Sequence, residues 1–318
     1  MKILLYAVHA EEKGWRQIAA ELAAKGHEIV LLSSEALNKC GDGIKNICVK
    51  RLREIKKTCR DENPYAVCVY GRYAVCFAAR FAGAERIIYV PAAGKKTCGF
   101  LFWHFFRHYK LPDLFCSKLP DTEPEKRAKL KNELGISPKA RLFLALGSAE
   151  AEADLRTFLL ASSEAAKQKT ALAFALSADG SLGESLAALR ADLDFSDRIF
   201  FLPKGKSAVD FITAADVIAA SSLPLKDGET VASALGVGIP LLLSDKCGEY
   251  IPGIDGKAGL VFEHGNSEAL ATAMCALAEN DSLFLKLQNG ATEIFKAEYS
   301  AEKAASDIER LILSENKK

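Results

Sequence analysis

A glycine, a glutamate and a threonine stand together where a loop meets a short helix. The stretch DGETVASALG contains Gly228, Glu229 and Thr230, and its apolar pattern predicts a helix over 230–236. The first amides of a helix have no partner within the helix, so they can donate to an anion such as a diphosphate. Gly228 would let the backbone approach that anion without a Cβ in the way. A glycine before a helix is also a common turn, so the stretch alone leaves both interpretations open.

Short apolar runs alternate with helical patterns on either side of this stretch. Continuous apolar strands separated by helices indicate a parallel sheet that helices cover on both faces. The runs expected to be strands are 2–8, 27–34, 66–70, 85–91, 141–148, 171–177, 197–203, 216–222, 239–245 and 259–263. The segments expected to be helices are 16–26, 71–83, 230–236, 282–297 and 300–314.

A polar stretch with several prolines, 111–130, divides this alternation into two series. A chain of 318 residues is also longer than one ordinary core requires. We therefore expect an α/β protein with two doubly wound parallel-sheet domains facing a cleft, in which ligands bind outside the carboxyl ends of the strands. We place a shortened N-terminal domain at 1–112, a second domain at 113–297, and a C-terminal helix at 298–318 that can pack back on the first domain.

Composition and charge argue against a nucleic-acid-binding protein and against a membrane-spanning one. A net charge of +1 gives no electrostatic case for binding nucleic acid. No apolar run approaches the ~20 residues of a membrane-spanning helix, and the first residues are too short for a signal-peptide core, so we expect a cytoplasmic protein. The nine cysteines form no CxxC pair, and those inside apolar runs, such as Cys68 and Cys76, are expected to be buried thiols.

The chain from Asp216 to Leu270 resembles the C-terminal signature of family 4 GT-B glycosyltransferases. It reads DVIAASSLPLKDGETVASALGVGIPLLLSDKCGEYIPGIDGKAGLVFEHGNSEAL, and SDKCGEYI within it leans toward the lipopolysaccharide core glucosyltransferase branch. Upstream, PEKRAKLKNELGISPKARLFLALGS and HAEEKGWRQIAAELAAKGHEIVLLSS are similar to the family's linker helix and first βαβ unit. The resemblance implies the GT-B fold, with an acceptor-side domain first and a nucleotide-sugar-binding domain second.

The resemblance also implies a donor substrate, a nucleoside-diphosphate sugar that we expect to be UDP-linked, and neither a metal nor another cofactor. The amides from Gly228 to Thr230 would hold the diphosphate. The family places two glutamates around this loop, one for the sugar and one for the ribose, and their positions are occupied here by Leu225 and Ser233. Ser233 could still bond a ribose hydroxyl, and Glu229 is the nearby carboxylate that could contact the sugar.

Two other motifs depart from the family pattern. Where the family has GRL-xxxKG, this chain keeps Gly147 but has Ser148 and three acids, so the basic pair that neutralises the departing diphosphate is absent. Lys204 and Lys206 in FLPKGKS could replace that pair, although two solvated loop lysines are an equally good interpretation. The family's GG-x-E-R has become HAEEK, in which His9 could act on an acceptor or have no catalytic part.

The stretch CGFLFWHFFRHYK, 98–110, is rich in aromatic and basic residues. Drawn as a helix, it suits a membrane interface, and it suits a helix packed inside the protein equally well. His104 and His108 are four residues apart, but no HExxH glutamate lies between them, so we expect no metal site. The residues expected to contact a membrane are Phe100, Trp103, Phe106, Arg107 and Lys110.

Two functions from different classes follow from these patterns. The first is a retaining glycosyltransferase that moves a hexose from the donor to a lipid-linked or polysaccharide acceptor, at the inner face of the cell membrane. The second is a catalytically silent GT-B homologue that binds a sugar nucleotide or serves as a scaffold in glycan assembly. A sugar-nucleotide epimerase is a weaker third interpretation, which product formation without any acceptor would distinguish.

Overall fold

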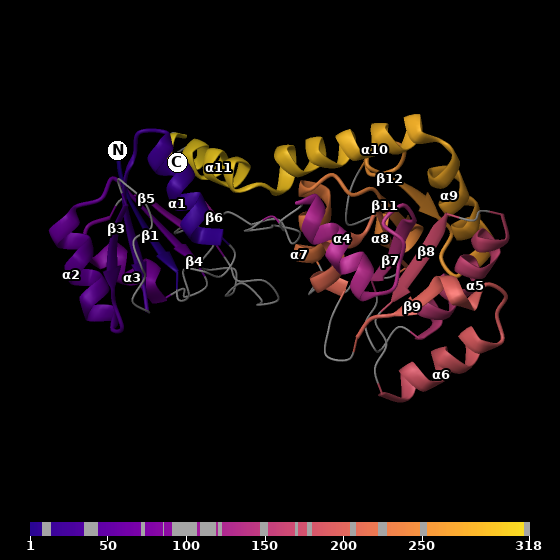
Figure 1. Cartoon of the computed structure of the whole chain (residues 1–318). Helices are drawn as coiled ribbons and strands as arrows, with labels where there is room; N and C mark the ends of the chain where they lie inside the picture. The colour runs from indigo at the N-terminus through magenta and orange to yellow at the C-terminus, as the bar shows by residue number, and fades with distance from the viewer. Residues whose placement is uncertain are drawn as a thin grey trace. The chain divides into compact units, whose positions relative to one another are not determined.

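The computed structural model of the chain separates into two compact units (Figure 1). Unit 1 comprises Met1–Lys118 and Ala297–Lys318, and unit 2 comprises Leu119–Lys296. The structure describes residues 1–7, 14–34, 44–70, 74–84, 86–90, 107–108, 119, 123–146, 152–168, 171–176, 180–203, 208–221, 228–248 and 253–314.

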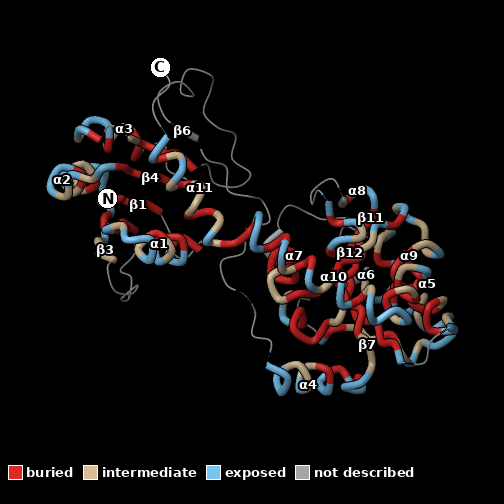
Figure 2. The backbone as a smooth tube through the Cα atoms, turned by 90° about the horizontal axis from the view of Figure 1, so that it is seen from above, coloured by how far each residue is buried: buried red, intermediate tan, exposed pale blue. Residues whose placement is uncertain are grey.

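The described part of unit 1 contains a parallel six-stranded sheet in the order β3-β2-β1-β4-β5-β6. Its strands are β1 (Lys2–Ala7), β2 (Glu28–Ser33), β3 (Ile44–Cys48), β4 (Ala66–Tyr70), β5 (Arg86–Val90) and β6 (Arg107–His108). Its helices are α1 (Trp15–Ala24), α2 (Leu52–Glu62), α3 (Ala74–Phe81) and α11 (Ala301–Leu313). Of the central strands, β4 is buried along its length and β1 is buried from Ile3 onward, as Figure 2 shows.

Alternate residues of each strand pack on opposite faces of this sheet. Ile3 and Leu5 of β1 belong to a cluster with residues of α1 and α11. Leu4 and Tyr6 belong to a second cluster with residues of α2 and α3. Because side chains along a strand point alternately to its two sides, a strand buried on both faces must be apolar throughout. This explains the continuous apolar run ILLYA, from Ile3 to Ala7.

The described part of unit 2 repeats the arrangement with a parallel sheet in the order β12-β11-β10-β7-β8-β9. Its strands are β7 (Arg141–Leu146), β8 (Leu172–Leu176), β9 (Ile199–Phe201), β10 (Val217–Ala220), β11 (Leu241–Ser244) and β12 (Gly259–Phe262). Its helices are α4 (Pro124–Glu133), α5 (Glu152–Gln168), α6 (Gly180–Ala191), α7 (Gly228–Gly236), α8 (Asp245–Gly248), α9 (Ser267–Glu279) and α10 (Asp281–Ile294). Residues of α5 and α9 form one buried cluster with strand residues such as Phe143 and Phe174.

The predicted strands and helices are confirmed, with boundaries within three residues of the expected ones. Three features of unit 1 differ from the expectation. The sequence analysis did not predict β3 or α2, and it treated 98–110 as a helix. The helix prediction is wrong at Arg107 and His108. These two residues form β6 and pair in parallel with Ile88 and Tyr89 of β5.

The remaining positions of the aromatic stretch lie outside the described residues. These positions include the predicted membrane contacts Phe100, Trp103, Phe106 and Lys110, and the side chain of Arg107 is not described either. Across the described part of the chain, no helix combines the length and apolar character needed to cross a membrane.

Candidate functional site

The strand order of unit 2 reverses between β7 and β10. From β7 the chain proceeds to β8 and β9 on one side of the sheet, and from β10 it proceeds to β11 and β12 on the other side. The two strands are neighbours, with Leu146 opposite Ala220 at their carboxyl ends. In open α/β sheets, ligands bind outside the carboxyl ends of the strands at this kind of reversal. The connections that leave β7 and β10 here lead to α5 and α7.

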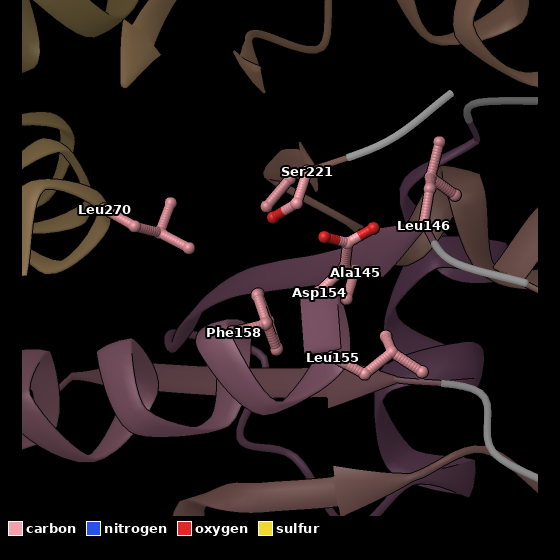
Figure 3. Close-up of a pocket in the computed structure, with 8 residues that line it drawn as sticks. Ala145, Leu146, Asp154, Leu155, Phe158, Ser221 and Leu270 are labelled. Carbon is pink, nitrogen blue, oxygen red and sulfur yellow. The ribbon is translucent and has the colours of Figure 1, made fainter. Parts of the chain in front are cut away.

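A small pocket that opens to solvent lies at this reversal, with space for about one water-sized molecule. Six of its eight lining residues are apolar, and Asp154 and Ser221 contribute the polar side chains. The carboxylate of Asp154 extends from the first turn of α5 toward Ser221, which follows β10 (Figure 3). The lining residues are Ala145, Leu146, Asp154, Leu155, Phe158, Ala219, Ser221 and Leu270.

The backbone carbonyl oxygen of Ser221 contacts side chains at the carboxyl ends of β11 and β12. Ser244, the last residue of β11, donates its hydroxyl to the Ser221 oxygen at 2.6 Å. The Nδ1 atom of His264, two residues after β12, lies 3.1 Å from the same oxygen. Asp245 in turn accepts a hydrogen bond from the His264 backbone N–H at 3.1 Å. These contacts fix the residue from which the chain departs toward α7.

His264 also faces the acidic start of α5. Its Nε2 atom lies 3.8 Å from Oδ1 of Asp154, and the two side chains are 28% and 12% exposed respectively. A second acid in the same turn, Glu152, accepts a hydrogen bond from the Ser185 hydroxyl at 2.9 Å. Carboxylates near a helix N-terminus interact favourably with the helix dipole. The carboxylates of Glu152 and Asp154 therefore occupy the N-terminus of α5, where an anionic ligand could otherwise bind.

The predicted helix after the glycine loop is present as α7, and it begins at Gly228. The backbone amides of Gly228, Glu229 and Thr230 therefore belong to its first turn, in which helical amides lack intrahelical partners. Thr230 and Ser233 are both buried, and Ser233 is only 8% exposed. The side chain of Glu229 is not described. The roles assigned to these residues stay predictions.

The other predicted site residues lie outside the described part of the chain. They are His9, Gly147, Ser148, Lys204 and Lys206. No site role was assigned from the sequence to Ser221, Ser244 or His264, although each ends or closely follows a predicted strand. Because the carboxyl ends of parallel strands share one edge of the sheet, polar residues in those places were the available signal.

The described cysteines agree with the expectation of buried thiols at Cys68 and Cys76. Burial raises the pKa of both thiols to about 12, so both are protonated at neutral pH. Cys59, Cys247 and Cys275 are buried as well, and Cys48 is exposed. Within the described residues, no group of three or more His, Cys, Asp or Glu side chains is arranged to hold a metal ion.

Comparison with known proteins identifies one matching family and many similar folds. Residues 140–280 match the family described as "Glycosyl transferases group 1". No match was found among curated protein sequences. The matched segment extends from the start of β7 to α10, so it includes every element of the pocket.

The solved structures that resemble this chain cover nearly its whole length. A glycosyltransferase from Rickettsia africae is 14% identical, with a TM-score of 0.65 and coverage of 98% of this chain and 97% of that one. Anabaena Alr3699/HepE in complex with UDP is 13% identical, with a TM-score of 0.60 and coverage of 98% and 99%. A putative UDP-N-acetylglucosamine 2-epimerase from Listeria monocytogenes is 17% identical, with a TM-score of 0.59 and coverage of 98% and 95%. These similarities and the two parallel sheets establish the GT-B fold.

Proposed function

We propose that this chain is a retaining glycosyltransferase that transfers a hexose from a nucleoside-diphosphate sugar to a lipid-linked or polysaccharide acceptor. The observation that carries the proposal is the family match over 140–280, because it contains both strands of the reversal and the start of α7. The UDP complex of the similar HepE protein supports a uridine nucleotide as the donor's leaving group.

The proposed chemistry assigns a role to each end of the donor. Transfer breaks the bond between the anomeric carbon and the diphosphate oxygen, and the electron pair leaves with the diphosphate. A new bond joins the anomeric carbon to the acceptor oxygen, and the proton of the acceptor hydroxyl is released. Donors aimed at such developing charge give large rate gains. The first-turn amides of α7, from Gly228 to Thr230, would hold the diphosphate, assisted by Lys204 or Lys206. Glu229 would contact the sugar and Ser233 the ribose, with Gly147 and Ser148 beside the nucleotide.

The acceptor side is proposed from the sequence resemblance. His9 follows β1 in unit 1 and would act on the acceptor hydroxyl. A lipopolysaccharide-type acceptor would place the protein at the inner face of the cell membrane. Contact with the lipid would involve Phe100, Trp103, Phe106, Arg107 and Lys110. No metal is needed in this scheme, since amides and lysines supply the positive charge.

One observation favours a second candidate, a catalytically silent protein that binds a sugar nucleotide. The carboxylate of Asp154 lies in the pocket at the start of α5, in the segment where the resemblance implies a basic pair. A negative charge there opposes the departure of a diphosphate through like-charge repulsion. A protein that only binds the nucleotide would release no nucleoside diphosphate with any acceptor.

The proposal is tested by isothermal titration of the wild-type chain and a Gly228→Asp variant with UDP, UDP-glucose and GDP-mannose. We expect micromolar binding of at least one nucleotide to the wild-type chain. The added carboxylate at the start of α7 should weaken that binding by at least tenfold, because it faces the diphosphate. Release of nucleoside diphosphate in the presence of acceptors then separates the transferase from the silent protein.

Ser282→Asp is the matched control. It adds the same charge to the first turn of α10, which begins beside Arg141 at the amino edge of the sheet, so nucleotide affinity should not change. If the wild-type chain binds none of the three nucleotides, or if Gly228→Asp binds as the wild-type chain does, the proposed site is wrong.

A further inference from the structure

Asp154 and His264 face each other across a gap that no direct hydrogen bond fills. The 3.8 Å between Asp154 Oδ1 and His264 Nε2 exceeds the ~2.7–3.2 Å of an N–H···O hydrogen bond. A polar separation of this length is one that a third polar atom can bridge. The pair lies at the carboxyl edge of the second sheet, beside the reversal between β7 and β10.

The orientation of the His264 ring is fixed by its other atoms. A carbonyl oxygen only accepts, so the Nδ1 atom that contacts Ser221 carries the hydrogen. The backbone N–H of His264 is held by Asp245. The ring therefore presents Nε2 toward Asp154, and 28% of the side chain remains exposed to solvent and to ligands.

The chemistry of the two facing groups selects the kind of ligand atom. A carboxylate only accepts hydrogen bonds, whereas a protonated Nε2 donates. A hydroxyl group can donate to the carboxylate and, at the same time, accept from Nε2 when that atom carries a hydrogen. A phosphate oxygen only accepts and would be repelled by Asp154. The carboxylate of Asp154 has two oxygens with several acceptor positions, so it can take part in more than one hydrogen bond.

We propose that Asp154 and His264 together bind a hydroxyl group of the sugar nucleotide, either on its ribose or on its transferred sugar. This inference rests on the proposed function, and it names a pair of residues outside the first turn of α7. His264 is a binding residue in this scheme, and Ser221 and Asp245 are positioning residues that hold its ring and backbone.

The test uses the full chain and a series of ligands that differ by single hydroxyl groups. UDP, 2′-deoxy-UDP, 3′-deoxy-UDP and UDP-glucose are titrated at one pH; if GDP-mannose is the donor bound, GDP and its deoxy forms replace them. His264→Asn keeps an amide nitrogen near the position of Nδ1, so it retains the bond to Ser221 and removes Nε2. His264→Gln places an amide nitrogen near Nε2, and Asp154→Asn weakens the acceptor.

For each variant the measured quantity is the ratio of its affinities for two ligands that differ by one group. A change that weakens the binding of every ligand equally leaves this ratio unchanged. If the ribose supplies the hydroxyl, the preference of the wild-type chain for UDP over one deoxy form falls about tenfold in His264→Asn and in Asp154→Asn. If the transferred sugar supplies it, the preference for UDP-glucose over UDP falls instead. His264→Gln should restore part of either preference. The exposed Glu268→Gln, four residues on, should leave both preferences unchanged.

Two results overturn the inference alone. In the first, the wild-type chain binds the nucleotide and both ratios are unchanged in His264→Asn and Asp154→Asn. In the second, affinity falls equally for every ligand, which indicates that the pair only supports the fold. If the wild-type chain binds no nucleotide of the series, the inference and the proposed function fail together.

Discussion

The carboxylate of Asp216 joins three elements of unit 2 at the edge opposite the pocket. It accepts hydrogen bonds from the Leu142 amide of β7 and from the Lys131 ammonium of α4, both at 2.8 Å. Arg127 of α4 pairs with its other oxygen. Lys131 is 3% exposed and also donates to the Ala140 carbonyl at 2.8 Å. These contacts attach α4 to the amino ends of β7 and β10.

We predict that Asp216→Ala destabilises unit 2 strongly, because it leaves the Lys131 ammonium buried beside Arg127 without its carboxylate. Removing one partner of a buried ion pair costs roughly 3–5 kcal/mol. The measurement is the urea midpoint followed by far-ultraviolet circular dichroism. Lys167→Ala, which removes an exposed pair with Glu164, should cost below about 1 kcal/mol. Equal midpoint shifts for the two variants would show that Asp216 is not structurally important.

For individual residues, the sequence predicted the part of the site at the start of α7 and missed the part around His264. The start of α7 followed from Gly228 and the helical pattern after it, which are local features. The position of His264 depends on β12 lying beyond β11 and β10 in the sheet. That order brings His264, Ser221 and Asp154 together although they are far apart in the chain, and local patterns do not contain it.

The C-terminal helix α11 is attached to unit 1 by both apolar and charged contacts. Ile308 and Ile312 belong to the cluster that contains residues of α1 and β1. Arg86 of β5 donates to the Ile312 carbonyl. The carboxylate of Glu309 contacts His27 Nε2 at 2.7 Å and Lys25 Nζ at 3.1 Å, both just beyond the end of α1.

We predict that the Glu309 contact loses its contribution to stability in acid. The hydrogen bond from His27 and then that from Lys25 hold the pKa of Glu309 below its ordinary value of 4.5. A pKa that is lower in the folded state than in the unfolded chain stabilises the fold above the unfolded value, and the effect is lost as pH falls through the folded value. Glu309→Gln should therefore lower the unfolding temperature more at pH 6 than at pH 3.

The control for this prediction is Glu302→Gln, because Glu302 is exposed on the same helix. Its unfolding temperature should stay close to that of the wild-type chain at both pH values. A Glu309→Gln difference that is equally large at pH 3 and pH 6 would contradict the assignment of the contact to an ionised carboxylate.

The three elements of unit 1 that the sequence missed, β3, α2 and β6, share a physical reason. β3 reads IKNIC, and none of its five residues is fully buried, since β3 is at the edge of its sheet. Only Ile55 and Cys59 of α2 are buried, so its apolar face is narrow. β6 has two described residues within a run of aromatic residues. By contrast, strands buried on both faces appear as unbroken apolar runs and were found.

On the scale of the whole chain, each unit contains one sheet with the same order of strands. Numbered within each unit, that order is 3-2-1-4-5-6 in both. The alternation of apolar runs and helices predicted parallel sheets and two domains. It did not give the strand order, and therefore did not locate the reversal between β7 and β10 at which the pocket lies. The central claim is that a sugar nucleotide binds at this reversal.

Hydrogen–deuterium exchange of the whole chain, with and without saturating UDP-glucose, tests that claim most directly. We predict slower exchange in 145–158, 219–236 and 241–266, which hold the carboxyl ends of β7, β10, β11 and β12 and the first turns of α5 and α7. Residues 124–140, around α4 at the opposite edge, should exchange unchanged. Unchanged exchange in the first three segments, or protection confined to 124–140, would contradict the account.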